Sequence, residues 1–99
     1  MYQILFSDEA KFDITEAFLW YESQREGLGM DFELCLEAGI KLIQRTPKIF
    51  EYRYKSIRIH FIQRFPYGIH YLVDTDESIK VFAVFHTSKN PSEWNKRLH

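Results

Sequence analysis

The chain has 99 residues, of which 45% are hydrophobic, 17% aromatic and 27% charged, and its formal net charge is −1. This length and composition predict one globular domain over residues 1–99 and exclude an intrinsically disordered chain. A lone cysteine, Cys35, excludes a disulfide framework, and no apolar run approaches the roughly 18 residues of a membrane span, so we expect a cytoplasmic protein without membrane contact.

The two halves of the chain differ in charge. Residues 1–50 contain 5 Lys or Arg against 9 Asp or Glu, whereas residues 51–99 contain 8 against 5. The second half is therefore the more basic one. This asymmetry is typical of a chain whose basic half meets an acidic partner or nucleic acid, and ordinary solvated surface also produces it.

The first half predicts a strand followed by two helices. Residues 2–6 are aromatic and β-branched, as in a short strand, and Ser7 stands where a helix N-cap belongs. Two apolar stripes at helical spacing follow, separated by a glycine turn at residues 27–29 and ended by Thr46-Pro47. The stripes consist of Ala10, Ile14, Ala17 and Tyr21, then Phe32, Leu36, Ile40 and Ile43. Trp20 lies beside the first stripe, where it either widens that stripe or contacts a partner.

The second half changes from helical to alternating periodicity. Residues 57–61, 69–73 and 79–85 predict antiparallel strands separated by turns. We expect Ile57, Ile59 and Phe61 to face the helices, with Arg58, His60 and Arg64 on the opposite face. Residues 79–85 are apolar on both sides and are predicted in the middle of the sheet.

The predicted fold class is α+β: an N-terminal strand and an antiparallel helical hairpin packed on one face of a small antiparallel β-sheet. The other face would carry a basic, aromatic concavity. No motif for a metal, a cofactor or a Ser or Cys nucleophile is present, so we expect neither a metal nor a small-molecule cofactor.

Several residues are candidates for a binding surface. Trp94 lies in a polar segment after Pro91, so it either folds back onto the sheet or waits for a partner. His86 ends a strand beside a polar loop that contains Lys89, which makes this pair the best candidate for acid–base chemistry. For most of the other candidates, packing inside the fold or an ordinary solvated surface would equally explain the residue at that position. The candidates for binding a target are Arg58, Arg64, His86, Lys89, Trp94 and Arg97, and those for binding a partner are Trp20, Tyr67 and Tyr71.

The order of motifs resembles the RelE/ParE toxin superfamily over nearly the whole chain, and the ParE-like branch in particular. The resemblance is carried, in chain order, by Asp13-Ile14, Ala17, Trp20-Tyr21-Glu22, Gly27-Leu28-Gly29, Phe32, Thr46-Pro47, Ile57-Arg58, Arg64-Phe65-Pro66-Tyr67, Ile69, Tyr71, Ala83-Val84-Phe85-His86, Lys89, Pro91, Trp94 and Arg97. It implies the toxin of a type II toxin–antitoxin, or plasmid stabilisation, system, held inactive by a cognate antitoxin.

The resemblance leaves two activities open. One branch cleaves messenger RNA on the ribosome, and the other poisons DNA gyrase without being a nuclease. Gly68 and Thr87-Ser88 stand where the nuclease branch carries arginines, and Trp94 replaces a terminal aromatic hydroxyl. We therefore expect a gyrase inhibitor that is not an enzyme. The alternatives are a ribosome-dependent RNase that uses His86 and Lys89, and a non-toxic relative that binds only the antitoxin.

Overall fold

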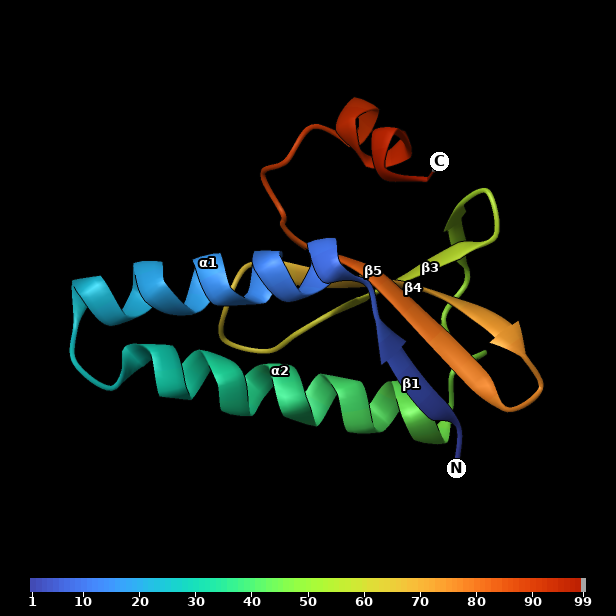
Figure 1. Cartoon of the computed structure of the whole chain (residues 1–99), viewed down its shortest axis with the longest axis horizontal. Helices are drawn as coiled ribbons and strands as arrows, with labels where there is room; N and C mark the ends of the chain where they lie inside the picture. Colours follow the sequence, from blue (N-terminus) through green and yellow to red (C-terminus); the bar gives the residue numbers. More distant parts are fainter. Residues whose placement is uncertain (99) are drawn as a thin grey trace.

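A computed structural model of the chain describes residues 1–98. Its elements are β1 (Gln3–Phe6), α1 (Asp8–Gln24), α2 (Leu28–Arg45), β2 (Tyr52–Tyr54), β3 (Ile57–Phe61), β4 (Tyr67–Thr75), β5 (Ser78–His86) and the 3₁₀ helix η1 (Pro91–Arg97). Figure 1 shows α1 and α2 side by side, with η1 on the side of α1 away from α2. None of the helices in this part of the chain combines the length and apolar content needed to cross a lipid bilayer.

Local sequence explains where the two long helices begin and end. The Ser7 hydroxyl accepts a hydrogen bond from the Ala10 N–H and caps α1. Gly27 has a φ of 87°, a left-handed conformation that glycine adopts without strain. Glu22 closes the turn, because its two carboxylate oxygens accept hydrogen bonds from the N–H groups of Gly27 and Gly29. The predicted antiparallel hairpin is therefore confirmed.

The five strands form one sheet in the order β1-β5-β4-β3-β2. All neighbouring pairs are antiparallel except β1 and β5, which are parallel and which the prediction of an antiparallel sheet did not include. Strand β5 has a neighbour on both sides, as its apolar character predicted, although β4 is the central strand of the five. The predicted α+β class is confirmed. Strand β2 and helix η1 are additions that sequence periodicity did not indicate.

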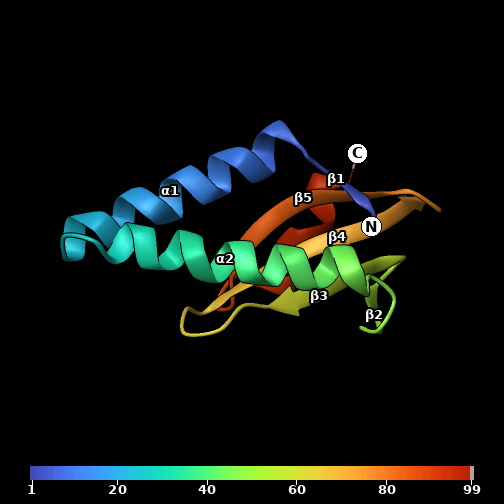
Figure 2. The ribbon, with the colours of Figure 1, turned by 90° about the horizontal axis from the view of Figure 1, so that it is seen from below.

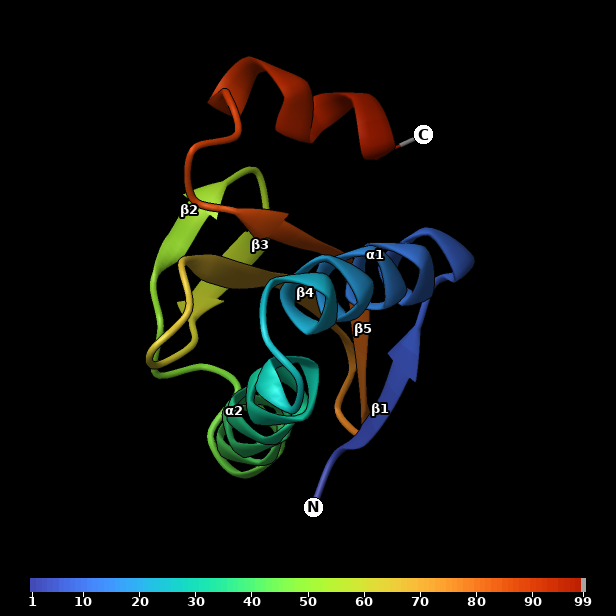
Figure 3. The same cartoon turned by 90° about the vertical axis from the view of Figure 1, so that its left-hand side faces the viewer.

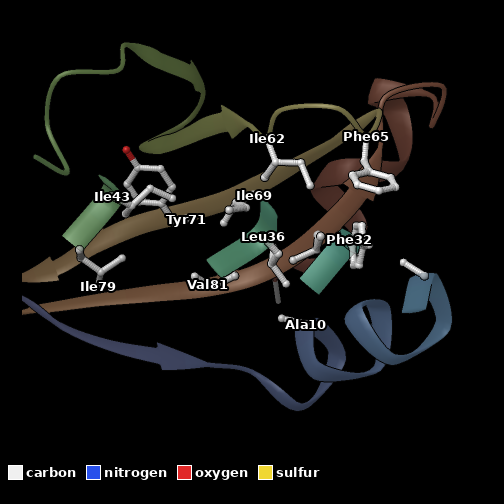
Figure 4. Packing of buried hydrophobic residues seen from close by; sticks show 12 residues of the cluster. Ala10, Phe32, Leu36, Ile43, Ile62, Phe65, Ile69, Tyr71, Ile79 and Val81 are labelled. Carbon is white, nitrogen blue, oxygen red and sulfur yellow. The ribbon is translucent and has the colours of Figure 1, made fainter. Parts of the chain in front are cut away.

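The main core fills the space between the helical hairpin and one face of the sheet. Figure 2 shows both long helices on this face. The interior is formed by fully buried side chains from α2, β4 and β5, shown in Figure 4, which include Phe32, Ile43, Ile69, Tyr71, Ile79 and Val81. The buried hydroxyl of Tyr71 donates a hydrogen bond to the Pro47 carbonyl at 2.7 Å. That bond ties the central strand to the segment after α2.

The predicted orientation of β3 is wrong. In the antiparallel register Arg58 pairs with Tyr71 and His60 with Ile69, and directly paired residues point to the same face. Because Tyr71 and Ile69 lie in the core, Arg58 and His60 face the helices, while Ile57, Ile59 and Phe61 face the other side. Gly39 makes room for the imidazole, since a Cβ at that position would lie 3.1 Å from the His60 ring. Strict alternation defines two faces but not which of them the helices cover.

A β-bulge in β5 supplies a second apolar cluster on the opposite face. Tyr71 pairs with Val81 and His70 with Ala83, so Phe82 is an extra residue in β5. The bulge lets Phe82 and Ala83 both contribute to this second cluster, and β5 is apolar on both sides because each of its faces meets an apolar cluster. The second cluster contains Ile57, Phe82, Ala83 and Phe85, with Tyr54, Leu72, Trp94 and Leu98 packed against it. Helix η1 covers this cluster, and Figure 3 shows η1 and α2 on opposite sides of the sheet.

Candidate functional site

An open groove of about 370 Å³ runs between α1 and the end of β5. One wall is the exposed side of α1, and the other is formed by the beginning of β4, the end of β5 and the loop that follows. The groove is lined by Phe12, Asp13, Glu16, Ala17, Trp20, Tyr67, Val84, Phe85, His86, Ser88 and Lys89. Four residues predicted separately as target-binding or partner-binding therefore share one surface: Trp20, Tyr67, His86 and Lys89.

The α1 wall presents aromatic side chains to solvent. Phe12 and Trp20 are 63% and 58% exposed, and Glu16 lies between them at four-residue steps, so all three follow one line along the helix. The buried residues Ala10 and Ala17 hold α1 against the body of the protein, and Ala17 also lines the groove. Sequence analysis identified Trp20 but missed Phe12. Phe12 precedes Glu16 by four residues and Trp20 by eight, outside the core stripe, and this spacing was the available signal.

Tyr67 joins the groove to the core. Its ring packs edge-on against Tyr21, Phe32 and His86, with the His86 ring centroid 5.2 Å away. Burial raises the pKa of the Tyr67 hydroxyl, and the nearby Tyr21 and Asp13 charges act in the same direction. The phenol therefore stays neutral at physiological pH and can donate a hydrogen bond to a ligand in the groove.

His86 and Lys89 form the polar end of the groove. The Nδ1 atom of His86 accepts hydrogen bonds from the Ser88 N–H at 3.0 Å and from the Ser88 hydroxyl at 2.8 Å. A neutral His86 ring therefore carries its proton on Nε2, which then acts as a donor. The Lys89 ammonium lies 4.9 Å from the centroid of the Phe85 ring, and within residues 1–98 it forms no ion pair. Its charge is available to a ligand.

Trp94 and Arg97 instead attach η1 to the rest of the molecule. The Arg97 guanidinium pairs with Asp13 of α1 at 2.5 Å and lies over the Phe85 ring, and only 18% of its side chain is exposed. Trp94 packs against Tyr54 and the edge of His70, so it folds back onto the sheet. Both residues were expected to bind a target, and both are engaged within the fold.

The remaining candidates lie outside the groove. Arg58 is at the β2–β3 edge of the sheet, where its Nε donates a hydrogen bond to the Phe50 carbonyl. Arg64 lies in the loop between β3 and β4 and approaches Asp31 of α2 to 3.7 Å. Both arginines therefore lie on the side of the sheet that the helices cover, and not on the opposite face where they were expected. Tyr71 is 0% exposed, so it contributes to the core and offers no surface to a partner.

Asp13 has a structural role that the sequence did not indicate. Its Oδ2 atom accepts a hydrogen bond from the Val84 N–H at 3.0 Å as well as from Arg97. One carboxylate thereby connects α1, β5 and η1 at the base of the groove. The signal in the sequence was indirect, because Asp13 belongs to the motif on which the family resemblance rests.

The α+β fold and the groove define a small protein with an exposed surface of aromatic and charged side chains. Its sequence matches the family model described as ParE toxin of type II toxin-antitoxin system, parDE, over residues 4–91. The chain therefore belongs to the ParE toxin family of type II toxin–antitoxin systems. Membership of this family implies an antitoxin as partner.

Individual relatives agree with this family. Toxin ParE2 of Mycobacterium tuberculosis, from strains CDC 1551/Oshkosh and H37Rv, is 31% identical over 81 residues, which are 81% of this chain and 76% of the relative. A chain from the solved chromosomal ParDE toxin–antitoxin system of P. aeruginosa superposes with a TM-score of 0.77 at 12% identity. The match covers 89% of this chain and 98% of that chain, and it shows a shared fold.

Proposed function

We propose that this ParE-type toxin acts by binding and poisoning DNA gyrase, and that its antitoxin neutralises it by occupying the groove between α1 and β5. One observation carries the proposal: the aromatic side chains suited to a partner, Trp20 and Tyr67, share a groove with the free cation Lys89 and with His86. A partner seated on the aromatic wall would cover the polar end as well. Target binding and neutralisation would then exclude each other by simple competition.

The geometry favours binding over RNA cleavage. A general base needs a free lone pair, and the Nδ1 lone pair of His86 already accepts hydrogen bonds from Ser88. Gly68 leaves no room for the arginine of the nuclease branch, because a Cβ there would lie 2.8 Å from the Ile59 side chain. Exposed Lys89 and the Nε2 atom of His86 are suited to contacting an acidic surface by hydrogen bonds and charge.

The target is tested by inducing the chain alone and following incorporation of labelled thymidine and labelled methionine. Inhibition of gyrase predicts that thymidine incorporation falls first, and purified protein should inhibit supercoiling by purified gyrase. A methionine signal that falls first would indicate a ribosomal target instead. Normal growth with abundant folded protein would identify a relative that only binds the antitoxin.

The polar end of the groove is tested with Lys89→Ala. We expect at least about a tenfold loss of gyrase inhibition, because an exposed charge that meets an acidic partner is removed. Lys80→Ala is the matched control, since Lys80 is likewise an exposed lysine but lies on β5 outside the groove. Equal inhibition by both variants would exclude Lys89 from the target-binding surface.

The aromatic wall is tested with Trp20→Ala. Loss of a large exposed aromatic anchor should weaken antitoxin binding by at least about 2 kcal/mol, as expected for an interface hot spot. Leu19→Ala is the control, because Leu19 is 56% exposed on the same helix but does not line the groove. Calorimetric titration of the antitoxin into each variant measures the difference, and an unchanged affinity for Trp20→Ala would place the antitoxin elsewhere.

A further inference from the structure

The β2–β3 edge of the sheet is basic, whereas α1 is acidic. Residues 48–64 contain five Lys or Arg against one Glu, and α1 contains five Asp or Glu against one Lys. Figures 2 and 3 show β2 on the side of the molecule away from α1. Charge is therefore separated across the molecule although its net value is only −1. A basic edge of this kind attracts a polyanion and turns the protein toward it.

Two arginines at this edge are held on aromatic rings. The Arg58 guanidinium lies 4.2 Å from the centroid of Tyr52, and its Nε donates to the Phe50 carbonyl at 2.6 Å. The Arg53 guanidinium lies 5.5 Å from the centroid of Phe61. Within residues 1–98 neither arginine pairs with a carboxylate. A guanidinium stacked on a ring keeps N–H donors free at its edge, and such a fork fits the oxygens of a phosphate group.

The cations surround this edge on three sides. Arg58 pairs in register with buried Tyr71, so it lies on the face of the sheet that the helices cover. Arg53 contacts Phe61, which lies on the other face. Lys55 is exposed in the turn that joins β2 to β3, where its φ of 49° is left-handed. The last two strands of the sheet therefore form a wedge with a cation on each face and one at its tip.

This wedge matches a groove that has anions along both walls. Strands β2 and β3 are the outermost two strands, and β2 has a neighbour on one side only. The major groove of B-DNA is about 12 Å wide, admits a two-stranded β-ribbon and has a row of phosphates along each side. A flat acidic protein surface would meet only one face of the edge. Single-stranded nucleic acid fits less well, because base stacking needs open ring faces, and a guanidinium covers one face of Tyr52 and of Phe61.

We propose that the β2–β3 edge is a sequence-independent binding site for double-stranded DNA. The edge enters the major groove, where Arg53 and Arg58 contact phosphates on opposite strands and Lys55 binds beside the turn. This site is separate from the groove between α1 and β5 and goes beyond the proposed function. Exposed lysines protect an edge strand from unwanted pairing, but that purpose does not explain why two arginines are oriented by aromatic rings.

The test is fluorescence anisotropy of a labelled DNA duplex of about two helical turns, titrated with the full chain over a series of salt concentrations. Three cations on phosphates predict a slope of about −2.7 for the logarithm of the binding constant against that of the salt concentration. A-form RNA has a narrow, deep major groove that does not admit the edge. An RNA duplex of the same sequence, and each single DNA strand, should therefore bind at least about tenfold more weakly.

Variants of the chain identify the site. Arg53→Gln, Lys55→Gln and Arg58→Gln should each make the salt slope shallower by about 1, because one phosphate contact is lost. Arg25→Gln is the matched control, since Arg25 is an arginine with a 68% exposed side chain at the distant helical turn, and it should leave the slope unchanged. Arg53 and Lys55 are exposed, so their variants carry the test even if Arg58→Gln disturbs the contact with the Phe50 carbonyl.

Four outcomes would overturn the proposal. They are equal binding of the RNA duplex, equal or tighter binding of a single strand, an effect of Arg25→Gln as large as that of Arg53→Gln, and displacement of the DNA by polyglutamate at equal charge, which would indicate an acidic protein as the occupant. The assay contains no gyrase. A chain that binds the duplex without affecting gyrase refutes only the proposed target, and one that inhibits gyrase but does not bind the duplex refutes only this inference.

Discussion

At the scale of single residues, Asp13 connects three parts of the fold through one carboxylate. It accepts hydrogen bonds from the Val84 N–H and from Arg97, and 12% of its side chain is exposed. Asp13→Asn keeps an oxygen for the Val84 N–H but removes the charge that pairs with Arg97. We expect a loss of about 1.5–3 kcal/mol in the free energy of unfolding, the range for hydrogen bonds to charged groups. Chemical denaturation of the two proteins measures it.

Lys96→Gln is the control for this change. It breaks the Lys96–Glu93 pair of η1, which is exposed on both sides, and pairs of that kind contribute between nothing and about 1 kcal/mol. Similar losses for the two substitutions would mean that partial burial of the Asp13–Arg97 pair adds little to stability. A loss confined to Asp13→Asn would identify this pair as the main polar attachment of η1.

At the scale of secondary structure, η1 depends on one aromatic anchor. Trp94 packs against both Tyr54 and His70, but its indole Nε1–H is buried without a hydrogen-bond acceptor within the described residues. Trp94→Phe removes this unsatisfied donor together with some packing volume, so we expect a loss below about 1 kcal/mol. Trp94→Ala removes the whole anchor and should cost about 3 kcal/mol.

The measurement for both variants is chemical denaturation in a Trp20→Phe background, compared with that background alone. Replacing Trp20, which is exposed, leaves Trp94 as the single tryptophan of the parent protein, so its fluorescence can be excited selectively. Denaturation of the Trp94 variants is followed by circular dichroism instead. If Trp94→Phe cost as much as Trp94→Ala, the Nε1–H would have an acceptor in solution.

The helices and strands also show how much of this fold could be predicted from the sequence. The helical hairpin and strands β3, β4 and β5 were predictable because each repeats an apolar pattern over several residues. Strand β2 has three residues and η1 is a 3₁₀ helix, and both are too short or too irregular for a periodic signal. The face of β3 was not predictable, because the apolar cluster under η1 gives Ile57 a buried environment on the side away from the helices.

The groove was predictable only in parts. Trp20, Tyr67, His86 and Lys89 were each singled out from local sequence, but their meeting in one groove depends on how α1 crosses the end of β5. Arg97 was assigned to target binding because it is a cation in a polar segment. Its contact with Asp13 joins residues 84 positions apart in the chain, and no local pattern encodes such a pairing.

At the scale of the whole molecule, a buried histidine couples stability to pH. His70 is 2% exposed, and its Nδ1 atom lies 2.7 Å from the Tyr54 hydroxyl. Burial and, to a smaller extent, the nearby Arg97 and Arg53 charges together lower the pKa of His70 from 6.5 to about 4. The unfolded chain therefore binds more protons than the folded protein between these two values. Stability contributed by neutral His70 is complete above pH 6.5 and is lost as the pH falls toward 4.

We therefore predict that the free energy of unfolding decreases by on the order of 2–3 kcal/mol between pH 7 and pH 4 through His70 alone. His60 contributes in the same direction, since burial lowers its pKa too, and the carboxylates of the protein add their own dependence. Comparison with His70→Gln isolates the His70 contribution, because the variant keeps every other titrating side chain. Its unfolding free energy should vary less steeply over this range in urea denaturation series. Parallel curves for the two proteins would mean that protonated His70 is accommodated, which would require the Trp94 cover to open on acidification and expose the second apolar cluster.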